Sequence, residues 1–189
     1  VILVGTETVC ESVVVQTNAS LEVSASSSLS ISGSTADGLS SEGTVTNAGL
    51  LSISSAGGIG FYNGGTFNNN GAGELRINGT VGEGLFQWDA TLNNAAKIKI
   101  GNTGNIGGYG INNRYSTINN NAGGDLTVDR TAESGIFVFT GSLNNVANIT
   151  IGGLATVGGN GILNGEVINN NTGGSILIDR TVGSGLHVS

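Results

Sequence analysis

Two Asp-Arg pairs are the residues of this chain whose types and spacing best suit catalysis. Asp129-Arg130 stands in the phrase VDRT, and Asp179-Arg180 stands in the phrase IDRT, 50 residues further on. In a stack of repeats, carboxyl groups at equivalent places two layers apart would lie about 10 Å from each other. An inverting glycosidase holds its acid and its base about 6.5–9.5 Å apart, so this spacing raises the hypothesis of sugar hydrolysis.

A structural role explains the same residues better. Asp followed by Arg at a strand end, with Thr131 or Thr181 closing the turn, is typical of a corner ion pair with a side-chain cap. Asn78 takes the equivalent place in the phrase INGT, where the carboxylate is missing. We therefore expect no catalytic residue in this chain and no enzyme activity.

The other residues that could do chemistry stand alone. Cys10 is the only cysteine and His187 the only histidine, which leaves no intrachain disulfide, no thiolate metal cluster and no apparent Ser-His-Asp set. His187 follows Leu186, which we expect to point inward, so the imidazole should face outward. The Gly-Gly-x-Gly-x-Asp phrase of calcium β-rolls is also absent. We expect neither a metal nor a cofactor.

The charge of the chain limits its partners. The net charge is −7, with six Lys and Arg in total. Nucleic-acid-binding proteins need Lys and Arg to displace phosphate counterions, and an anionic membrane surface attracts the same residues. No apolar run approaches the ~20 residues of a membrane helix. We expect no nucleic acid partner and no membrane insertion.

The elements that must position these residues repeat with a fixed period. An apolar residue precedes an Asn pair or triplet at spacings of 25, 26, 25 and 25 residues. The aligned residues are Phe67, Leu92, Ile118, Leu143 and Ile168, with Val45 before them. A fixed period of this length is the signature of a solenoid, in which each repeat buries its apolar residues only by stacking on its neighbours.

Each repeat contains three apolar segments, which predict three short strands. The second segment alternates with period 2, as in Leu75/Ile77, Ile98/Ile100, Leu126/Val128, Ile149/Ile151 and Ile176/Ile178. The third begins directly after a Gly, at Ile59, Leu85, Ile111, Ile136, Ile162 and Leu186. We predict an all-β fold, a parallel β-helix of around seven coils of about 25 residues each. An antiparallel sandwich is the alternative.

The repeats alternate in pairs. Asn triplets mark one kind of coil, and Gly-Gly-x-Gly phrases at 57–60, 107–110 and 158–161 mark the other, which gives a two-coil repeat of about 50 residues. We interpret these Gly pairs as backbone at positive φ in a tight corner. Residues 1–44 are expected to form narrower, Ser-rich coils of the same solenoid, and residues 45–189 its regular coils. The chain is expected to be a window of a longer protein.

The asparagines are predicted to form a ladder inside the solenoid. The second Asn after each aligned apolar residue should point inward with it, and a buried amide needs hydrogen-bond partners. These residues are Asn69, Asn94, Asn120, Asn145 and Asn170. Stacked amides can supply partners to one another, as they do in cross-β structures. A ligand-binding array of Asn on the surface is the alternative.

An apolar and aromatic strip is predicted on the outside. Residues that follow the inward residue of the third strand should face solvent, and so should those two positions further on. The strip comprises Tyr62, Phe86, Trp88, Phe137, Phe139 and Leu163. Large exposed apolar patches mark interaction sites, so we expect this face to contact another chain, a neighbouring domain or a glycan. The alternative is an inverted register that buries these side chains.

Three phrases carry a family resemblance: TVTNAGLLSIS, GTFNNNGAGELRING and TLNNAAKIKIG. They resemble repeat regions of very large bacterial surface or secreted proteins, the filamentous-haemagglutinin-like and Bacteroidetes-type β-helical adhesins. The resemblance covers most of the chain from about residue 13 on. It implies a right-handed β-helix, export to the cell surface, and a role in adhesion or in extracellular filaments, with no catalytic residues to carry over.

Three functions therefore compete. The favoured one is a structural or adhesive extracellular fibre that associates with like chains or with a surface glycan. The second is a β-helical polysaccharide-binding or polysaccharide-cleaving protein, similar to a tailspike or a lyase, in which Asp129, Arg130, Asp179 and Arg180 would act. The third is an ice-binding solenoid, for which Thr80, Thr131 and Thr181 would have to form a flat outward array.

Overall fold

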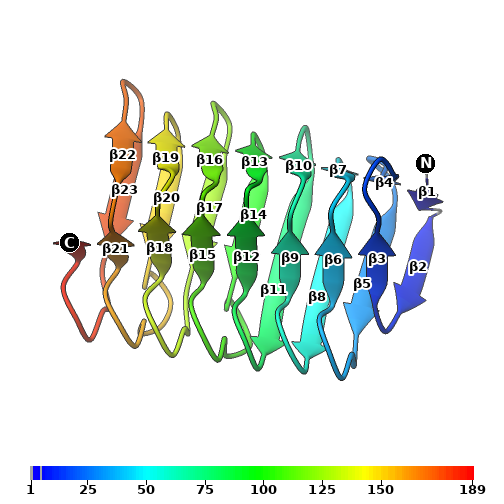
Figure 1. The fold of residues 1–189 in the computed structure, drawn as a ribbon, viewed down its shortest axis with the longest axis horizontal. Helices are drawn as coiled ribbons and strands as arrows, with labels where there is room; N and C mark the ends of the chain where they lie inside the picture. The colour runs from blue at the N-terminus through cyan, green and yellow to red at the C-terminus, as the bar shows by residue number, and fades with distance from the viewer. Residues whose placement is uncertain (1, 5) are drawn as a thin grey trace.

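The computed structural model describes residues 2–4 and 6–189, which wind into one right-handed solenoid of parallel strands (Figure 1). The 24 strands form three sheets of eight, and every third strand along the chain belongs to the same sheet. The predicted parallel β-helix is confirmed, and the antiparallel alternative is wrong. There are eight coils instead of around seven, because residues near the start of the chain already form the strands of the first coil.

The first sheet contains β1 (Ile2–Val4), β4 (Ser20–Val23), β7 (Thr44–Asn47), β10 (Thr66–Asn69), β13 (Thr91–Asn94), β16 (Thr117–Asn120), β19 (Ser142–Asn145) and β22 (Val167–Asn170). The second contains β2 (Glu7–Cys10), β5 (Ser28–Ser32), β8 (Leu50–Ala56), β11 (Glu74–Thr80), β14 (Lys97–Ile100), β17 (Asp125–Val128), β20 (Asn148–Ile151) and β23 (Ser175–Ile178). The third contains β3 (Val13–Val15), β6 (Leu39–Ser41), β9 (Phe61–Asn63), β12 (Leu85–Trp88), β15 (Ile111–Arg114), β18 (Ile136–Phe139), β21 (Ile162–Asn164) and β24 (Leu186–Val188). We number the coils 1 to 8, so that coil 1 is β1–β3 and coil 8 is β22–β24.

The core is a set of apolar columns that run along the solenoid. Val45, Phe67, Leu92, Ile118, Leu143 and Ile168 pair in register from coil to coil, as the sequence period predicts. The members of this column in coils 3 to 7 are fully buried. Burial of apolar surface by stacking is the main stabilising term in such a fold, since one coil alone would expose both of its faces.

The third-strand column differs from the prediction in coil 3. Phe61 pairs with Leu39 and with Leu85, so Phe61 and not Ile59 points inward. The preceding glycine explains the difference. A Cβ on Gly60 would lie 2.5 Å from Ile77 Cγ2 and 2.6 Å from a neighbouring backbone oxygen, so this place before the strand requires a glycine. Ile59 also follows a glycine, so the sequence pattern placed the inward residue of coil 3 two positions too early.

The Gly-Gly pairs do not adopt the predicted positive φ. The glycines with positive φ stand elsewhere, in the turns at Gly71, Gly123 and Gly173 among others. A Cβ on Gly107 would lie 2.0 Å from Val81 O, and one on Gly158 would lie 2.3 Å from Ala132 O. The Gly pairs therefore allow close approach to the backbone of the preceding coil, which is the other reason why a position requires glycine.

The two alternating kinds of coil differ in the lengths of the connections between their strands. In the even coils the third Asn of each triplet opens a turn, in which the amide three residues on donates to its carbonyl, as Gly73 N does to Asn70 O at 2.9 Å. In coils 5 and 7 that turn is shorter, and a longer connection follows the second strand instead. Two five-residue loops, 101–105 and 152–156, lie in these long connections. Asp129, Arg130 and Arg180 of the predicted Asp-Arg pairs bind to these two loops.

Candidate functional site

The predicted inner ladder of asparagine amides is present. Each Nδ2 donates to the Oδ1 of the next coil at 2.7–2.8 Å. The chain of donors runs through Asn47, Asn69, Asn94, Asn120, Asn145 and Asn170. Asn47 was missed from the sequence, although it stands two residues after the inward Val45 and follows from the same rule.

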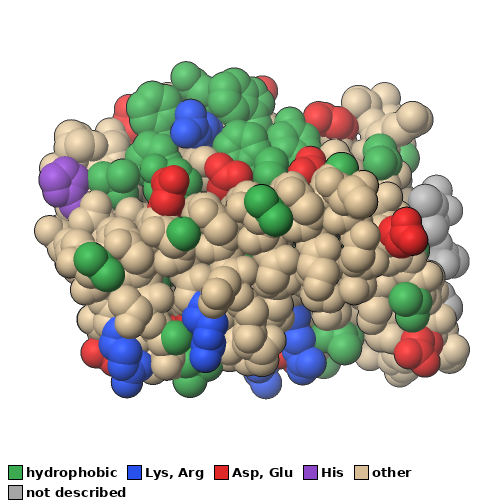
Figure 2. All heavy atoms as spheres, turned by 90° about the horizontal axis from the view of Figure 1, so that it is seen from below, with side chains coloured by type: hydrophobic (Ala, Val, Ile, Leu, Met, Phe, Trp, Pro, Cys, Tyr) green, Lys and Arg blue, Asp and Glu red, His purple; other side chains and the backbone are tan. Residues whose placement is uncertain are grey.

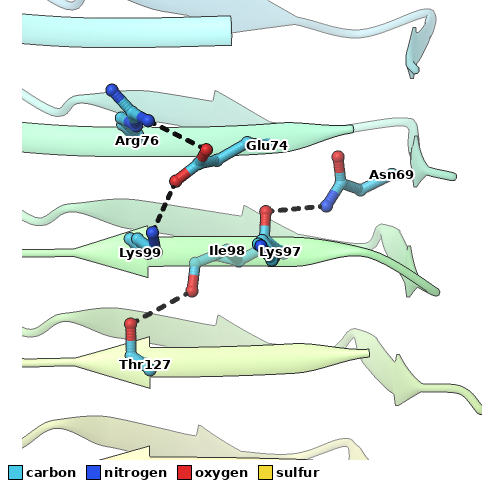
Figure 3. A network of polar contacts seen from close by, with 7 residues as sticks. All are labelled: Asn69, Glu74, Arg76, Lys97, Ile98, Lys99 and Thr127. Atoms are coloured by element: carbon cyan, nitrogen blue, oxygen red, sulfur yellow. Dashed lines mark hydrogen bonds and ion pairs between the residues drawn. The ribbon is translucent and has the colours of Figure 1, made fainter. Parts of the chain in front are cut away.

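The second hydrogen of these amides is also used. Asn69 Nδ2 donates to Lys97 O at 2.9 Å (Figure 3), and Asn120 Nδ2 donates to Asn148 O at 2.9 Å. Asn145 Nδ2 does the same with Ala147 O at 3.0 Å. These amides are buried and have their donors satisfied by the protein itself, which gives the inner ladder a structural role.

A second ladder of amides runs along the outside of the same sheet. Asn68, Asn93, Asn119, Asn144 and Asn169 are linked by hydrogen bonds of 2.8–2.9 Å. Here each Nδ2 donates toward the preceding coil, opposite to the direction of the inner ladder. The doubled Asn of the sequence is therefore two ladders, one on each face of the strand, because successive side chains alternate between faces.

Asn78 and Asp129 each bind one side of a long loop. Asp129 Oδ1 accepts the backbone N–H groups of Leu154 and Ala155, at 2.8 and 3.1 Å. Asn78 Oδ1 accepts those of Thr103 and Gly104 in the same way, at 2.9 and 3.2 Å. Each acid or amide in an even coil thus binds the loop of the odd coil that follows it.

The arginines bind the same loops from the other side. Arg130 Nη1 donates to the carbonyls of Gly101 and Asn102, at 3.1 and 2.5 Å. Arg180 Nη1 donates to those of Gly152 and Gly153. Loop 101–105 is therefore held between Asn78 and Arg130, and loop 152–156 between Asp129 and Arg180. We call these arrangements the corner clamps.

The two carboxylates are not assembled as a pair of acid and base. Asp129 is 2% exposed and binds backbone amides, not the Arg130 that the sequence analysis paired with it. Asp179 is half exposed and lies 3.4 Å from Arg180, which is the predicted corner ion pair. The threonines close the turns as expected, with Thr131 Oγ1 donating to Glu133 O at 2.6 Å. The geometry is that of a fold element and not of an acid–base centre.

A charged cluster on the outer face of the second sheet links two coils. Glu74 on β11 lies 2.9 Å from Arg76 and 2.7 Å from Lys99 on the neighbouring β14 (Figure 3). The hydrogen bond from Arg76 is the main cause that lowers the pKa of Glu74 to about 2, against the opposing effect of burial, and Lys99 lowers it further. Both cations are satisfied by this carboxylate, so the cluster is a cross-strand ion network.

The predicted aromatic strip lies on the outer face of the third sheet, and the inverted register is wrong. Figure 2 shows hydrophobic side chains gathered along the upper edge of that view, with a basic side chain among them. Trp88 and Phe139 are 44% and 41% exposed, and the other four predicted residues are half-buried. Tyr62 pairs with Phe86 and not, as predicted, with Trp88, because Phe61 is the inward residue of coil 3.

The outward residues form two columns over coils 3 to 7. The first outward column is Tyr62, Phe86, Asn112, Phe137 and Leu163. The second outward column contains Trp88, Arg114 and Phe139 in register, and Gly64 and Gly165 follow the strands of coils 3 and 7 at its two ends. We call the two columns, together with Tyr109 and Tyr115, the aromatic face.

The rings of the aromatic face form a connected network. Trp88 contacts Phe86 and Tyr115, with ring centroids 6.3 and 5.1 Å apart. Phe137 stacks on Tyr109 at 5.2 Å and lies 5.8 Å from Phe139. Further contacts join Tyr62 to Phe86 and Tyr115 to Phe139, at 5.8 and 6.1 Å. Seven of the nine aromatic residues of the chain are on this face, and the other two, Phe61 and Phe67, are in the core.

Sequence reasoning missed Tyr109 and Tyr115. Tyr115 stands after a strand end and has a φ of 53°, a left-handed conformation that turns its ring back over Trp88. Asp89 and Thr140 have the same conformation in coils 4 and 6, with φ of 51° each. These three coils contain one more residue in this corner than coils 3 and 7. That length difference is the signal in the sequence that could have found the extra aromatic position.

Polar groups lie at the centre of the aromatic face. Arg114 Nε donates to Asn112 Oδ1 at 3.1 Å, and Asn112 Nδ2 donates to Glu83 Oε1 at 3.1 Å. The guanidinium also lies 5.6 Å from the ring of Phe137 and 5.7 Å from that of Phe139. Burial, followed by a nearby carboxylate, raises the pKa of Tyr62 and of Tyr109; the carboxylates are Glu42 and Glu133.

The isolated chemical groups are placed as follows. His187 on β24 is exposed and pairs in register with Leu163, as its predicted outward direction requires. Cys10 is partly buried against the core, and this burial raises the pKa of its thiol. Within the described residues, no three His, Cys, Asp or Glu side chains come together as a metal site. In the same part of the chain, no helix has the length and hydropathy of a membrane crossing.

Comparison of the chain with protein-family models, with curated proteins and with solved structures finds no match. The resemblance to β-helical adhesins therefore depends on the repeat phrases of the sequence alone.

Proposed function

We propose that this chain is a rigid structural and adhesive segment of an extracellular or cell-surface repeat protein. In that role it serves as a fibre or stalk that associates with like chains or with a surface ligand through its aromatic face. The observation that supports this most is the use of its polar groups. The inner ladder, the outer ladder and the corner clamps all join one coil to the next, which is what a load-bearing rod requires.

The absence of enzyme activity is part of the proposal. Asp129 is buried on backbone amides, and Asp179, in the equivalent corner two coils further on, is paired with Arg180. A hydrolytic site needs an acid and a base that both reach the substrate. Polysaccharide binding without cleavage is the second candidate, because aromatic rings beside the Arg114 guanidinium offer both flat apolar surface and hydrogen-bond donors.

An ice-binding function finds no support in the threonines that suggested it. Thr80 and Thr131 are 5% and 3% exposed, and the Oγ1 of each donates to a backbone carbonyl two residues on. A flat outward array of hydroxyls cannot include buried threonines.

Surface labelling of intact cells tests the proposed location and role. An epitope placed at Leu154, an exposed residue of loop 152–156, should be stained on unbroken cells of the source organism and removed by added protease. Deleting the parent gene should reduce cell attachment or cell–cell aggregation. An epitope that is stained only after lysis would overturn the proposal.

A further inference from the structure

Five asparagines of this chain are followed directly by glycine. Such a pair can react with itself, because glycine has no side chain to shield its backbone nitrogen from the Asn carboxamide. The nitrogen attacks Cγ, the new N–C bond closes a succinimide ring, and the side-chain nitrogen leaves as ammonia. Water then opens the ring to aspartate or to isoaspartate, in which the main chain continues through the side-chain carboxyl carbon. The pairs are Asn63-Gly64, Asn70-Gly71, Asn78-Gly79, Asn160-Gly161 and Asn164-Gly165.

Three of these pairs are held by backbone hydrogen bonds between coils. The glycine N–H groups donate at 2.7–2.9 Å to a carbonyl of a neighbouring coil: Gly64 to Ser41, Gly161 to Ser184 and Gly165 to Val138. An N–H in such a bond is released only when the solenoid opens locally. The side chains of Asn63 and Asn164 are also buried. The glycine nitrogens of these pairs are therefore not free to attack.

The pair Asn78-Gly79 is held through its carboxamide. Asn78 Oδ1 accepts the backbone N–H groups of Thr103 and Gly104, so the side chain is directed across to loop 101–105 of the next coil. The carboxamide reaches the nitrogen of Gly79 only if it turns back over its own main chain, which breaks both hydrogen bonds. The corner clamp that positions this loop therefore also protects Asn78.

Asn70-Gly71 has neither kind of protection. The pair lies in the turn after β10, where Asn70 is exposed. The backbone of Asn70 is fixed, since its N–H donates to Asn47 O and its carbonyl accepts from Gly73 N, both at 2.9 Å. Within the described residues, no group bonds to its carboxamide and none accepts the N–H of Gly71. A Cβ on Gly71 would meet nothing within 4 Å, which leaves room for the ring.

The same corner of coil 6 provides an internal comparison. Asn121 is exposed there as well, and its carbonyl accepts the same kind of hydrogen bond, from Gly124 N at 2.8 Å. The next residue is Ala122, whose β-carbon shields the nitrogen that would have to attack. The positive φ lies one position later, at Gly123. Coil 4 therefore differs from coil 6 in the residue that decides the reaction.

We propose that Asn70 is a site of spontaneous modification, which deamidates through a succinimide to aspartate and isoaspartate while the other four pairs stay intact. Water is the co-reactant, and ammonia is released. Each event adds one negative charge to the formal net charge of −7. The corner after β10 projects beyond the shorter corner after β13 (Figure 1), so the extra main-chain atom of isoaspartate should leave the coils stacked. This inference is independent of the proposed function.

Peptide mapping of the folded chain tests the site. The chain is incubated at mildly alkaline pH in water labelled with heavy oxygen, and its peptides are then fragmented in a mass spectrometer, which separates Asn70 from Asn63. Asn70 should take up heavy oxygen at a rate that rises with pH and exceeds that of every other Asn-Gly pair at least about tenfold. An equal rate at another pair would overturn the proposal. So would an Asn70 that stays intact while a free peptide of residues 66–74 is fully converted.

Exchange of two corner residues between coils tests the role of the glycine. The double variant Gly71→Ala/Ala72→Gly gives coil 4 the corner sequence of coil 6, and should slow the reaction at Asn70 at least about tenfold. The reciprocal variant Ala122→Gly/Gly123→Ala should create a second reactive site at Asn121. Circular dichroism checks that both variants keep the β signal. Undiminished reaction at Asn70 in the first variant would contradict the mechanism.

Unfolding tests whether the solenoid selects the site. In concentrated urea the contacts between coils are lost, so all five Asn-Gly pairs should react at similar rates and the excess at Asn70 should disappear. Rates that keep their native order in urea would mean that the local sequence selects Asn70, and would overturn the protection assigned to the hydrogen bonds between coils.

Discussion

At the scale of the residue, the asparagines stabilise this molecule by satisfying one another. Asn69, Asn120 and Asn145 are each held between two other amides and a backbone carbonyl, so the loss of one member affects its neighbours. The outer ladder has the same chemistry in contact with water, where lost hydrogen bonds are replaced by solvent. Position on the inside or outside of the strand therefore decides how much each Asn contributes.

Asn120→Ala tests the inner ladder at its middle. The substitution leaves the buried Asn94 Nδ2 without its acceptor and the buried Asn145 Oδ1 without its donor, and should lower the free energy of unfolding by about 2–4 kcal/mol. Asn119→Ala, the adjacent outer position, should cost under about 1 kcal/mol. Urea unfolding followed by circular dichroism measures both. Equal losses for the two variants would contradict the ladder argument.

The alternation of strand faces made the inner ladder predictable from sequence, since a residue two positions after a buried Phe or Ile must also point inward. The partners of Asp129 could not be predicted in this way. They are backbone amides of a loop 25 residues further on, and no side chain in that loop marks it as a binding partner. Contacts to backbone leave no trace in residue type, so the structure was needed to find the corner clamps.

At the scale of the element, ion pairs between strands add to the stacking. Glu74 joins Arg76 on its own strand with Lys99 on the next, and its pKa is lowered to about 2. A lowered carboxylate pKa means that the stabilisation is present above the ordinary value near 4.5 and is lost as pH falls through about 2.

Glu74→Gln should therefore destabilise the chain at neutral pH and have little effect in acid. The expected loss at pH 7 is about 1 kcal/mol, less than the pKa shift alone would give, because the Arg76 side chain is 46% exposed and water screens the pair. Urea unfolding at about pH 7, 4 and 2 should show the difference from the unsubstituted chain shrinking to near zero. The exposed Glu22→Gln on β4 is the control, and a difference that is constant across pH would argue against the assignment.

The corner clamps predict which deletions the solenoid tolerates. Removing residues 91–141, which form coils 5 and 6, brings loop 152–156 beside Asn78 in place of loop 101–105. Removing only residues 91–116, which form coil 5, leaves Asn78 and Arg130 without a loop between them. We expect the two-coil deletion to unfold at a higher urea concentration than the one-coil deletion, although it is the shorter chain. Stability that simply follows the number of coils would contradict this.

The register of the third sheet marks the limit of sequence reasoning at this scale. The rule that a glycine precedes the inward residue is correct, but it has two solutions in GGIG, and only strand pairing selects Phe61 over Ile59. The period of the first strand contained no such ambiguity, because Asn follows each inward residue. The buried position of a repeat can be identified from the sequence where a recognisable residue, such as Asn in the first strand, stands beside it.

At the scale of the whole molecule, the length of a particle distinguishes side-by-side association of two chains from end-to-end stacking. Eight coils at the strand spacing give a rod about 38 Å long. Two rods that associate side by side through the aromatic face, on coils 3 to 7, would overlap along most of their length, so the pair should be little longer than one rod. End-to-end stacking of two chains would give about 77 Å. If like chains associate through the aromatic face, small-angle X-ray scattering over a concentration series should show a wider particle of nearly constant length, and a doubled length would contradict lateral association.

Trp88 gives any association through the aromatic face an intrinsic optical reporter. It is the only tryptophan of the chain, it lies among Phe86, Tyr115 and solvent, and it belongs to none of the core columns. Its fluorescence emission should therefore shift to shorter wavelength when the aromatic face is covered. The same signal should change little when the core unfolds, since the indole is already partly in water. Emission and circular dichroism would then follow association and folding as two independent events in one unlabelled sample.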